Sequence, residues 1–433
     1  MSSRNSSTGV TDRNVWVSMA LLLVCLVSAP AAARADVVLD WNTIAARTVG
    51  GQNPFNQARL MAITHLAVFE AVNAVTGEYE SYLADPIAAP AVTSADAAAI
   101  AAAYKVLKNY FPADASIDTD RMNALAAIPD GLAKTNGITV GEAAADALIL
   151  LRATDGSSPA TFFVPSSTEA GDWLLTVGCP PGGGVLYQWK DVTPFGIESP
   201  ADFLLPGPPS LTSNDYAKDY LEVKTMGARN SADRPAERAE IARLYAGSSP
   251  TFALGAIARQ IAAAKGLSLS ANARAFALIM MGVNDSLIAS FYNKYHYGFW
   301  RPETAIPAGA ADGNDKTDGD ATYVPFIPTP CFPSYPSNHA SGTNGGLEVM
   351  RRVFGAAGHD ITFTNNVPAL GSLPATTLTR HYTQLKEIAD DVDDARVYGG
   401  IHFRFDQADG NVLGRAVATE IYKNYLRPVN GQE

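Results

Sequence analysis

The chain has 433 residues, of which 47% are hydrophobic and 17% are charged. This length exceeds what one hydrophobic core comfortably supports, so we expect one large domain or two intimately packed domains. The formal net charge of -11 argues against nucleic acid or an anionic membrane as the main partner, because both attract basic surfaces. An anionic substrate would therefore need a basic pocket inside an acidic shell.

The first 35 residues have the pattern of a signal peptide. Arg4 and Arg13 precede an apolar run over residues 15–27, and an Ala-Arg-Ala sequence at 33–35 supplies a cleavage site. We expect the mature chain to begin at Asp36 and to be exported to the periplasm or the extracellular space. A non-cleaved anchor is the alternative, because the polar segment before the apolar run is long.

Charged residues interrupt the apolar runs that follow the signal peptide. Arg259, Lys265, Arg274 and Asp285 divide the longest run, residues 252–291. Because a membrane-spanning helix needs about 20 predominantly apolar residues, we expect a soluble mature protein with no membrane partner.

Two cysteines, Cys179 and Cys331, remain after removal of the signal peptide. An oxidising compartment would allow them to form a disulfide. The sequence does not establish the proximity that a disulfide needs, so their pairing stays open at this point.

Helical periodicity dominates the chain and strand-like alternation is scarce, so the predicted fold class is all-α, with two packed helical bundles. Residues 36–153 are expected to form an N-terminal bundle, and residues 210–433 a C-terminal helical domain that carries the active site. Between them, residues 154–209 are rich in Gly, Pro and Ser, which predicts a long irregular crossing segment. The expected helices cover residues 56–73, 94–110, 117–127, 139–153, 213–226, 235–246, 251–265, 270–297, 337–354, 383–397 and 406–426.

The first candidate segment reads KYHYGFWRP. Lys294 and Arg301 are seven residues apart, so their side chains would project from one face if the helix continued that far. Two cations on such a stripe commonly mark only a solvated face. The aromatic residues at 297, 299 and 300 favour burial of this helix end instead.

The second segment, PSYPSNHASG, places Ser337 where it would cap a new helix. The amino end of a helix offers unpaired N–H groups and a positive dipole end, which together suit an anion. His339 lies in the first turn. Taken alone, a histidine there is more often structural than catalytic.

The third segment, ARVYGGIHFRFDQADG, contains His402 and Asp406 at i and i+4. On a helix this spacing lets the carboxylate accept the Nδ1 proton and leaves Nε2 free as a nucleophile or metal ligand. Arg396 would point away from that pair on a continuous helix. Gly399 and Gly400 could break the helix and turn Arg396 inward.

Each segment is a weak signal alone, but together they supply three permanent cations, two histidines and a helix amino terminus. This set suits a tetrahedral oxyanion that carries more than one negative charge. A simple binding protein would have less need for two histidines of which one is oriented by a carboxylate. That pair favours nucleophilic and general acid–base chemistry.

Two polar residues on apolar helices have other interpretations. His65 is expected to be a hydrogen-bonded core histidine. Asp285, on the same expected helix as Lys294, could pair with one of the cations or serve another structural purpose.

The three segments resemble the shared signature of vanadium-dependent haloperoxidases and type 2 phosphatidic acid phosphatases, K-x6-R-P, P-S-G-H and S-R-x5-H-x3-D. The segment around His65 and the all-helical layout resemble the secreted bacterial haloperoxidase branch. The matching positions are Lys294, Arg301-Pro302, Pro336-Ser337-Asn338-His339, Ala395-Arg396, His402 and Asp406.

The resemblance implies a vanadate cofactor bonded to Nε2 of His402, which Asp406 would orient. Lys294, Arg301 and Arg396 would neutralise its oxygens, with help from the Ser337 hydroxyl and the Asn338 backbone N–H. His339 would act as the acid–base group. With these roles, the resemblance implies a haloperoxidase that uses hydrogen peroxide, a halide and a small organic acceptor.

The same resemblance leaves two alternatives open. Phosphate in the same site would make the protein a secreted acid phosphatase that forms a phosphohistidine at His402. A catalytically inactive oxyanion-binding protein is the third interpretation.

Some positions depart from the signature or refine it. Ala395 replaces the usual serine, and Asn338 replaces glycine, which keeps the N–H but adds a side chain beside the anion. Asn tolerates positive φ better than most residues. Phe332 and Phe291 fall at positions that imply an apolar halide pocket.

Overall fold

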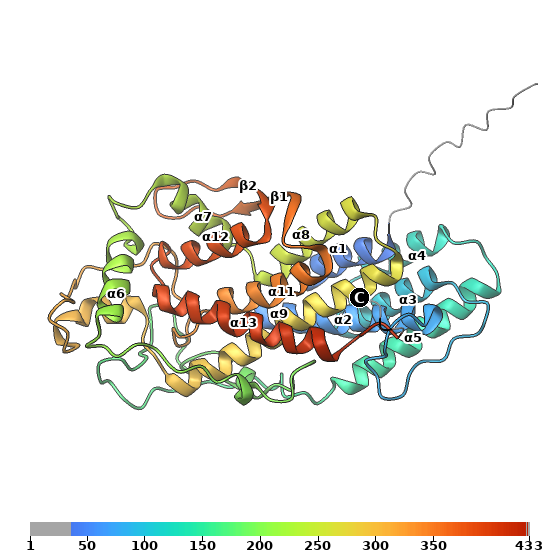
Figure 1. Cartoon of the computed structure of the whole chain (residues 1–433), viewed down its shortest axis with the longest axis horizontal. Coiled ribbons are helices and arrows are strands. Elements are labelled where there is room, and N and C mark those ends of the chain that lie inside the picture. The colour runs from blue at the N-terminus through green and yellow to red at the C-terminus, as the bar shows by residue number, and fades with distance from the viewer. Residues whose placement is uncertain (1–35, 430, 432–433) are drawn as a thin grey trace, which may run out of the picture. The chain divides into compact units, whose positions relative to one another are not determined.

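The structure is a computed structural model that describes residues 36–429 and 431. The predicted signal peptide, residues 1–35, lies outside the described residues. Residues from Asp36 onward form one compact unit, which is helical except for one two-stranded antiparallel sheet, so the predicted all-α class is confirmed (Figure 1).

Within the described residues, which begin at Asp36, five helices precede the crossing segment. Asn53 caps the second helix by accepting hydrogen bonds from the N–H groups of Phe55 and Asn56. The third helix begins after Ser94, as the sequence predicts. The helices are α1 (Val37–Val49), α2 (Pro54–Thr76), α3 (Ala95–Tyr110), α4 (Ser116–Ala126) and α5 (Leu132–Leu151).

The sequence prediction missed α1 and began α5 seven residues too late. Gly137 and Gly141 both lie where α5 packs on α3. A Cβ atom at Gly141 would lie 2.2 Å from the carbonyl oxygen of Ala98. The glycines therefore permit close helix contact and do not end the helix.

The irregular segment after α5 contains two short 3-10 helices, η1 (Tyr187–Asp191) and η2 (Pro200–Phe203). Asp285 on α9 holds this segment: its carboxylate accepts hydrogen bonds from the N–H groups of Phe195 (2.8 Å) and Gly196 (2.6 Å). The suggestion that Asp285 pairs with a cation of the candidate site is therefore wrong. Its partners are backbone donors of the crossing segment.

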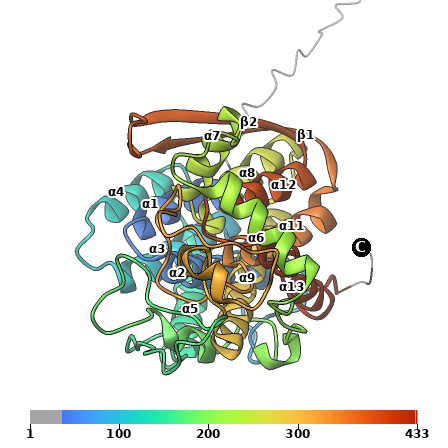
Figure 2. The ribbon, with the colours of Figure 1, turned by 90° about the vertical axis from the view of Figure 1, so that its left-hand side faces the viewer.

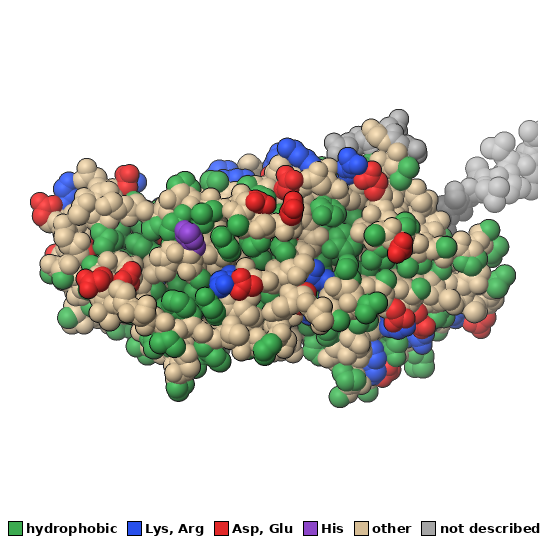
Figure 3. All heavy atoms as spheres, turned by 90° about the horizontal axis from the view of Figure 1, so that it is seen from below, with side chains coloured by type: hydrophobic (Ala, Val, Ile, Leu, Met, Phe, Trp, Pro, Cys, Tyr) green, Lys and Arg blue, Asp and Glu red, His purple; other side chains and the backbone are tan. Residues whose placement is uncertain are grey.

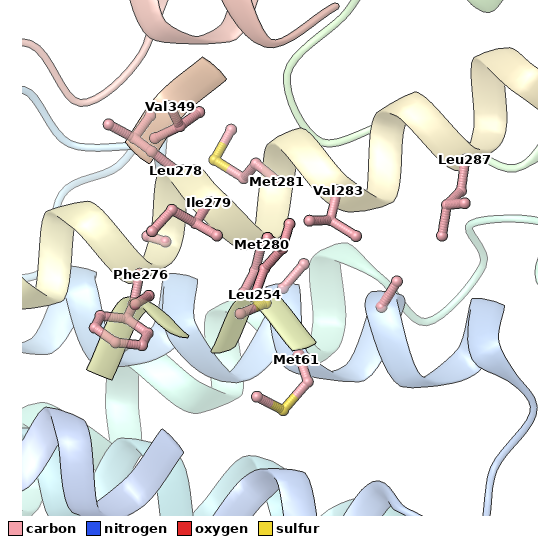
Figure 4. Close-up of a cluster of buried hydrophobic side chains, with 14 of the residues drawn as sticks. Met61, Leu254, Phe276, Leu278, Ile279, Met280, Met281, Val283, Leu287 and Val349 are labelled. Carbon is pink, nitrogen blue, oxygen red and sulfur yellow. The ribbon is translucent and has the colours of Figure 1, made fainter. Parts of the chain in front are cut away.

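The remaining helices surround α9, which packs against α2, α11 and α13. Figure 4 shows part of the core, where side chains from α2, α8, α9 and α11 meet. A Cβ atom at Gly345 on α11 would lie 2.4 Å from the carbonyl oxygen of Gly282 on α9, so only glycine permits this approach. The helices are α6 (Asn214–Gly227), α7 (Ala236–Ala246), α8 (Pro250–Lys265), α9 (Leu269–Tyr297), α10 (Pro302–Ala308), α11 (Asn338–Phe354), α12 (Leu385–Val397) and α13 (Arg404–Asn424), with the 3-10 helix η3 (Gly309–Ala311).

The antiparallel hairpin of β1 (Ala357–Val367) and β2 (Thr376–Gln384) was not predicted. It lies beside α7, α8 and α12 (Figure 2). Ile361 and Phe363 alternate with polar residues and point into the core. This short alternation is the signal that the sequence prediction overlooked, and β2 shifts the start of α12 from residue 383 to Leu385.

Two described helices, α2 and α9, are long and apolar enough to cross a membrane by length and composition. The apolar windows of these helices are 89% and 94% buried inside the fold, so both act as core helices here. The face shown in Figure 3 carries scattered acidic and basic side chains, with apolar groups exposed between them.

Candidate functional site

The two cations of the first motif reach the site from different elements. The helix α9 ends at Tyr297, and Gly298 takes a left-handed conformation with φ of 57°. Arg301 is the N-cap of α10. The helix ends at residue 297, as predicted, so it does not continue to Arg301, and the turn at Gly298 lies between the two cations. Both side chains are fully buried.

Lys294 uses all three of its N–H donors on backbone carbonyls. Its Nζ donates to Pro333 (2.8 Å), Ser334 (2.7 Å) and Pro336 (2.5 Å). Burial, and next the charge of Arg301, hold the pKa of Lys294 well below its ordinary value. In this arrangement the ammonium group holds the loop that precedes α11.

Arg301 bridges that loop and the third motif. Its Nε donates to the carbonyl of Phe332 at 2.9 Å, and its Nη1 donates to the carbonyl of Ile401 at 2.8 Å. Nη1 also lies 2.9 Å from Nε2 of His402. Burial lowers the pKa of Arg301 to about 10.

The helix α11 begins at Asn338, and Ser337 is its N-cap, as predicted. Asn338 is helical, so this position does not require the left-handed conformation that glycine or asparagine would permit. Its Oδ1 accepts a hydrogen bond from Ser290 Oγ at 2.6 Å. That bond orients the amide, and Nδ2 is buried with no hydrogen-bond partner within residues 36–429.

His339 follows in the first turn of α11 and is partly exposed. Burial, and next the charge of Arg396, hold its pKa well below the ordinary value, while hydrogen bonds to the backbone of Ser248 and Tyr245 partly offset this effect. The ring is therefore neutral near pH 7 and able to accept a proton.

The break between α12 and α13 brings the third motif together. The helix α12 ends at Val397, and Gly400 has a φ of 81°, so the predicted break at the two glycines is confirmed. Arg396 is buried, and burial lowers its pKa to about 9. His402 lies in the turn before α13 and not on the helix itself.

His402 and Asp406 form the predicted pair. His402 Nδ1 lies 2.8 Å from Asp406 Oδ2, which also accepts from Ser334 Oγ (2.5 Å) and from the N–H of Phe403 (3.1 Å). Because Arg301 donates toward Nε2, the imidazole carries its proton on Nδ1. The Nε2 lone pair therefore faces the cationic side of the site.

Burial controls the charges of this pair. It raises the pKa of Asp406 to about 7. It also holds the pKa of His402 well below its ordinary value, an effect that the charge of Arg301 strengthens. An entering anion would favour the charged form of His402 and disfavour the carboxylate form of Asp406.

A cavity of about 500 Å³ opens on these residues. Asn338, His339, Arg396 and His402 line its polar end, and Phe332 lies on its wall. Phe291 is fully buried behind Phe332, with ring centroids 5.1 Å apart. Of the two residues predicted for the halide pocket, Phe332 therefore lines the cavity and Phe291 packs behind Phe332.

Unpaired donors give the site its chemical character. Arg301 Nη2, Arg396 Nε and Asn338 Nδ2 are buried and have no hydrogen-bond partner in the described part of the chain. Within the same residues neither arginine forms an ion pair with a carboxylate: Asp406 Oδ2 is taken by His402, Ser334 and Phe403, and Asp406 Oδ1 has no hydrogen-bond partner. Buried donors without acceptors fit an oxyanion, and vanadate or phosphate would satisfy them.

Two contributors were not predicted. Ser334 supports Asp406, and Ser290 orients Asn338. Ser334 lies within the second candidate segment, PSYPSNHASG, so its place in the sequence could have identified it. Ser290 lies one helical turn before Lys294 and belongs to no motif. Cys179 and Cys331 form a disulfide at the edge of the cavity, which resolves their pairing.

Comparisons with known proteins agree with this arrangement. Residues 274–431 match the family described as the VCPO second helical-bundle domain. A stretch of 171 residues is 26% identical to the vanadium chloroperoxidase of Curvularia inaequalis. The match covers 31% of this chain and 28% of the chloroperoxidase, so it spans less than a third of that relative.

Solved bacterial structures share the whole fold. A bacterial vanadium-dependent iodoperoxidase has a TM-score of 0.72 at 22% identity, over 91% of this chain and 97% of that one. An apo-type bacterial vanadium-dependent chloroperoxidase has a TM-score of 0.70 at 17% identity, over 86% and 94% of the two chains. A holo-type chloroperoxidase structure gives 0.68 at 17% identity, over 87% and 93%. The resemblance to the haloperoxidases is thus confirmed, and these structures establish the fold.

Proposed function

We propose that this chain, whose residues 274–431 belong to the family of VCPO second helical-bundle domains, is a vanadate-dependent haloperoxidase. It would oxidise a halide with hydrogen peroxide to hypohalous acid. The observation that carries the proposal is the set of buried, unpaired donors on Arg301, Arg396 and Asn338 beside Nε2 of His402.

The positive charges and the hydrogen-bond donors of the site fit vanadate. His402 Nε2 would bond the metal, and Asp406 would keep the ring in the required tautomer. Arg301 and Arg396 would neutralise the oxygens. Asn338 would donate from Nδ2 as well as from its backbone N–H, and Ser337 from its hydroxyl.

Vanadate would supply a Lewis acid that activates peroxide toward halide, and the vanadium itself would keep its oxidation state. The protein residues contribute charge stabilisation and proton transfer. His339, neutral in the free site, would accept the proton of incoming peroxide at a ring nitrogen and return it to the leaving water. The fixed guanidinium groups need little reorganisation when charge develops.

Lys294 has a different role from the one that the resemblance implies. Its three hydrogen bonds to carbonyls occupy every donor of the ammonium group. We assign it to positioning the loop that carries Ser337, with a long-range electrostatic effect on the anion.

A secreted acid phosphatase is the second candidate, because the same observation favours it. The pair of His402 and Asp406 presents an unprotonated Nε2 toward a cradle that suits phosphate equally well. His402 would attack phosphorus to form a phosphohistidine, and His339 would protonate the leaving alcohol.

One assay separates these functions. Purified protein is incubated with hydrogen peroxide, bromide and an activated diketone, with and without added vanadate, and separately with an aryl phosphate. Halogenation that requires vanadate and is lost in His402→Ala is the expected result. Release of phosphate without halogenation would favour the phosphatase, and vanadate binding without either reaction would favour an inactive oxyanion-binding protein.

Export to the periplasm or beyond remains part of the proposal. The disulfide between Cys179 and Cys331 supports it, because such bonds persist in oxidising compartments. Amino-terminal sequencing of protein recovered outside the cytoplasm should begin at Asp36. Recovery of the uncleaved chain in the membrane fraction would contradict this.

A further inference from the structure

A second cavity, of about 390 Å³, shares no lining residue with the cavity at the oxyanion site. It lies between α7, the turn at residues 229–234 and the tip of the β1–β2 hairpin at residues 370–373. Phe326 lines this second cavity and Ile327 lines the first, and both belong to one small apolar cluster. The two cavities are therefore separate, and the volume of the second is in the range of about 300–1,000 Å³ that small organic ligands occupy.

The walls of the second cavity are mainly cationic where they are polar. Arg229, Arg234 and Arg243 line it, together with one carboxylate, that of the exposed Glu240. The hydrogen-bond partners of Arg234 and Arg243 are backbone carbonyls. Three guanidinium groups against one carboxylate give the cavity a positive charge, although the chain as a whole carries a formal charge of -11.

Arg243 is the most deeply buried of these three arginines, with 6% of its surface exposed. Its Nη2 donates to the carbonyls of Pro368 (3.0 Å) and Pro374 (2.6 Å), so it holds the hairpin tip against α7. Its Nε has no hydrogen-bond partner within residues 36–429. Buried donors without partners are rare in folded proteins, and an acceptor on a ligand would satisfy this one.

Arg274 shows how a buried arginine is accommodated where no cavity lies beside it. Its Nη2 also lacks a hydrogen-bond partner in the described residues. Its guanidinium lies 5.2 Å from the ring centroids of Tyr79 and Tyr422, and its Nε donates to the carbonyl of Leu426 at 2.7 Å. Packing against two rings accounts for Arg274. Arg243 differs, because its side chain borders an open cavity.

Arg234 fixes the turn that carries Arg229. Its guanidinium lies 3.7 Å from the ring centroid of Phe326. Its Nη1 donates to the carbonyl of Ala228 at 2.8 Å, and its Nη2 donates to that of Arg229 at 3.3 Å. The N–H of Arg229 donates to the carbonyl of Val324 at 2.8 Å. The backbone of Arg229 is thus held on both sides, while its exposed side chain lines the cavity.

The hairpin tip supplies a preformed apolar wall. Leu370 and Leu373 exchange backbone hydrogen bonds of 2.9 and 3.0 Å, and Gly371 between them has a φ of 58°. Both leucines are half-buried and pack against the apolar cluster that contains Phe326. The cavity therefore combines cationic groups with an apolar surface.

We propose that this second cavity binds a small organic carboxylate with an apolar body, such as a medium-chain fatty acid. Arg229 and the Nε of Arg243 would donate to the carboxylate, whose planar shape fits a guanidinium. The apolar body would lie against Leu370 and Leu373. Glu240 on the same wall disfavours a ligand with a second negative charge. This inference is independent of the proposed function, because it uses none of the residues of the oxyanion site.

Calorimetric titration of the full chain with octanoate tests the binding. Arg229→Glu reverses one charge of the cavity at an exposed position. Lys423 is exposed at the end of α13, outside the cavity, so Lys423→Glu is a control with the same change in net charge. We expect saturable binding that Arg229→Glu weakens roughly tenfold or more and Lys423→Glu leaves unchanged.

A second variant fills the cavity without altering its charge. Ala236 is exposed at the start of α7 and lines the cavity, so Ala236→Trp should weaken octanoate binding as strongly as Arg229→Glu does. Ala263 is exposed on α8, outside the cavity, and Ala263→Trp should leave the affinity unchanged. Arg243 itself is kept, because its replacement would also release the hairpin tip.

Two further ligands separate the charge from the apolar body. Octanol lacks the charge and acetate lacks the body, so each should bind roughly tenfold more weakly than octanoate, or worse. Absence of saturable octanoate binding would overturn the proposal, as would octanol or acetate that binds as tightly as octanoate. Octanoate affinity that is unchanged in both Arg229→Glu and Ala236→Trp would place the ligand elsewhere and would overturn it too.

Discussion

Two groups among the arginines buried in this fold differ in their partners. Arg59 and Arg152 in the N-terminal region share Asp155, with Nε of Arg59 at 2.6 Å and Nη2 of Arg152 at 3.1 Å from Oδ2. Arg301 and Arg396 form no ion pair with a carboxylate within the described residues. We call the first group compensated, because its two cations share one carboxylate, and the second uncompensated, because it has none in the described chain.

The difference separates structure from function. Arg152 also donates to the carbonyls of Thr193 and Pro194, so the compensated group joins α2 and α5 to the crossing segment. Buried charges that lack partners cost free energy. In the second group that cost is relieved when an oxyanion binds. The position of these two arginines beside His402 indicates a ligand site, and the missing counter-charge alone does not, because Arg243 and Arg274 are also buried without a carboxylate partner in the described residues.

The largest expected effect concerns the compensated group. Asp155→Asn would leave Arg59 and Arg152 buried without a counter-charge and should destabilise the protein by about 3–5 kcal/mol. Urea denaturation measures the change. Vanadate affinity of the folded variant should stay unchanged, and a loss below 1 kcal/mol in stability would contradict the structural role.

The next largest effect concerns the uncompensated group. Arg396→Met removes one buried cation and should lower vanadate affinity by about 2–4 kcal/mol, roughly 30- to 1,000-fold. Stability without ligand should hold or increase, because the cost of burying a lone charge is removed. A destabilisation as large as that of Asp155→Asn would show that Arg396 is structural.

The free energy of unfolding should depend on pH in two different windows, one set by His339 in the ligand site and one by Asp155 in the compensated group. Burial lowers the pKa of His339, so the unfolded chain takes up a proton first as pH falls below its unfolded value of 6.5, and the folded state loses stability. Asp155 has a lowered pKa, so its contribution is lost only below its unfolded value of 3.8.

His339→Gln should therefore flatten the stability profile between pH 6.5 and 5 by up to about 1.4 kcal/mol per pH unit. Denaturant titrations at each pH in vanadate-free and phosphate-free buffer measure it. Asp406 acts in the opposite direction, because its pKa raised to about 7 makes the folded state retain a proton there. An unchanged slope in His339→Gln would contradict the assigned pKa direction.

The smallest expected effect concerns Asn338, which replaces the glycine of the signature. Ser290→Ala should release the amide of Asn338 and weaken vanadate binding by about 1 kcal/mol, roughly fivefold. Asn338→Gly should give a similar loss, and the double variant should lose no more than either single variant. Full additivity would show that Ser290 and Asn338 act independently.

Much of the site was predictable because its chemistry lies in local motifs. The spacing of His402 and Asp406 predicted their hydrogen bond, and Gly399 and Gly400 predicted the break that turns Arg396 inward. The spacing of Lys294 and Arg301 drew attention to both residues, but they do not share a helix face. The left-handed cap at Gly298 separates them, and only tertiary structure brings them together.

Long-range contacts were not predictable from one sequence. Asp285 binds backbone N–H groups some 90 positions earlier, and the sequence carries no pattern for such a contact. The three carbonyls that surround Lys294 likewise depend on the path of the loop at 333–336. The hairpin was missed because its alternating run is short and lies among stronger helical patterns.

A crystal structure of the protein grown with vanadate tests the central claim most directly. The account predicts tetrahedral or bipyramidal density bonded to Nε2 of His402, with Arg301 Nη2, Arg396 and Asn338 Nδ2 within hydrogen-bonding distance of its oxygens. Density elsewhere, or none at saturating vanadate while Arg301 and Arg396 remain without anionic partners, would contradict it.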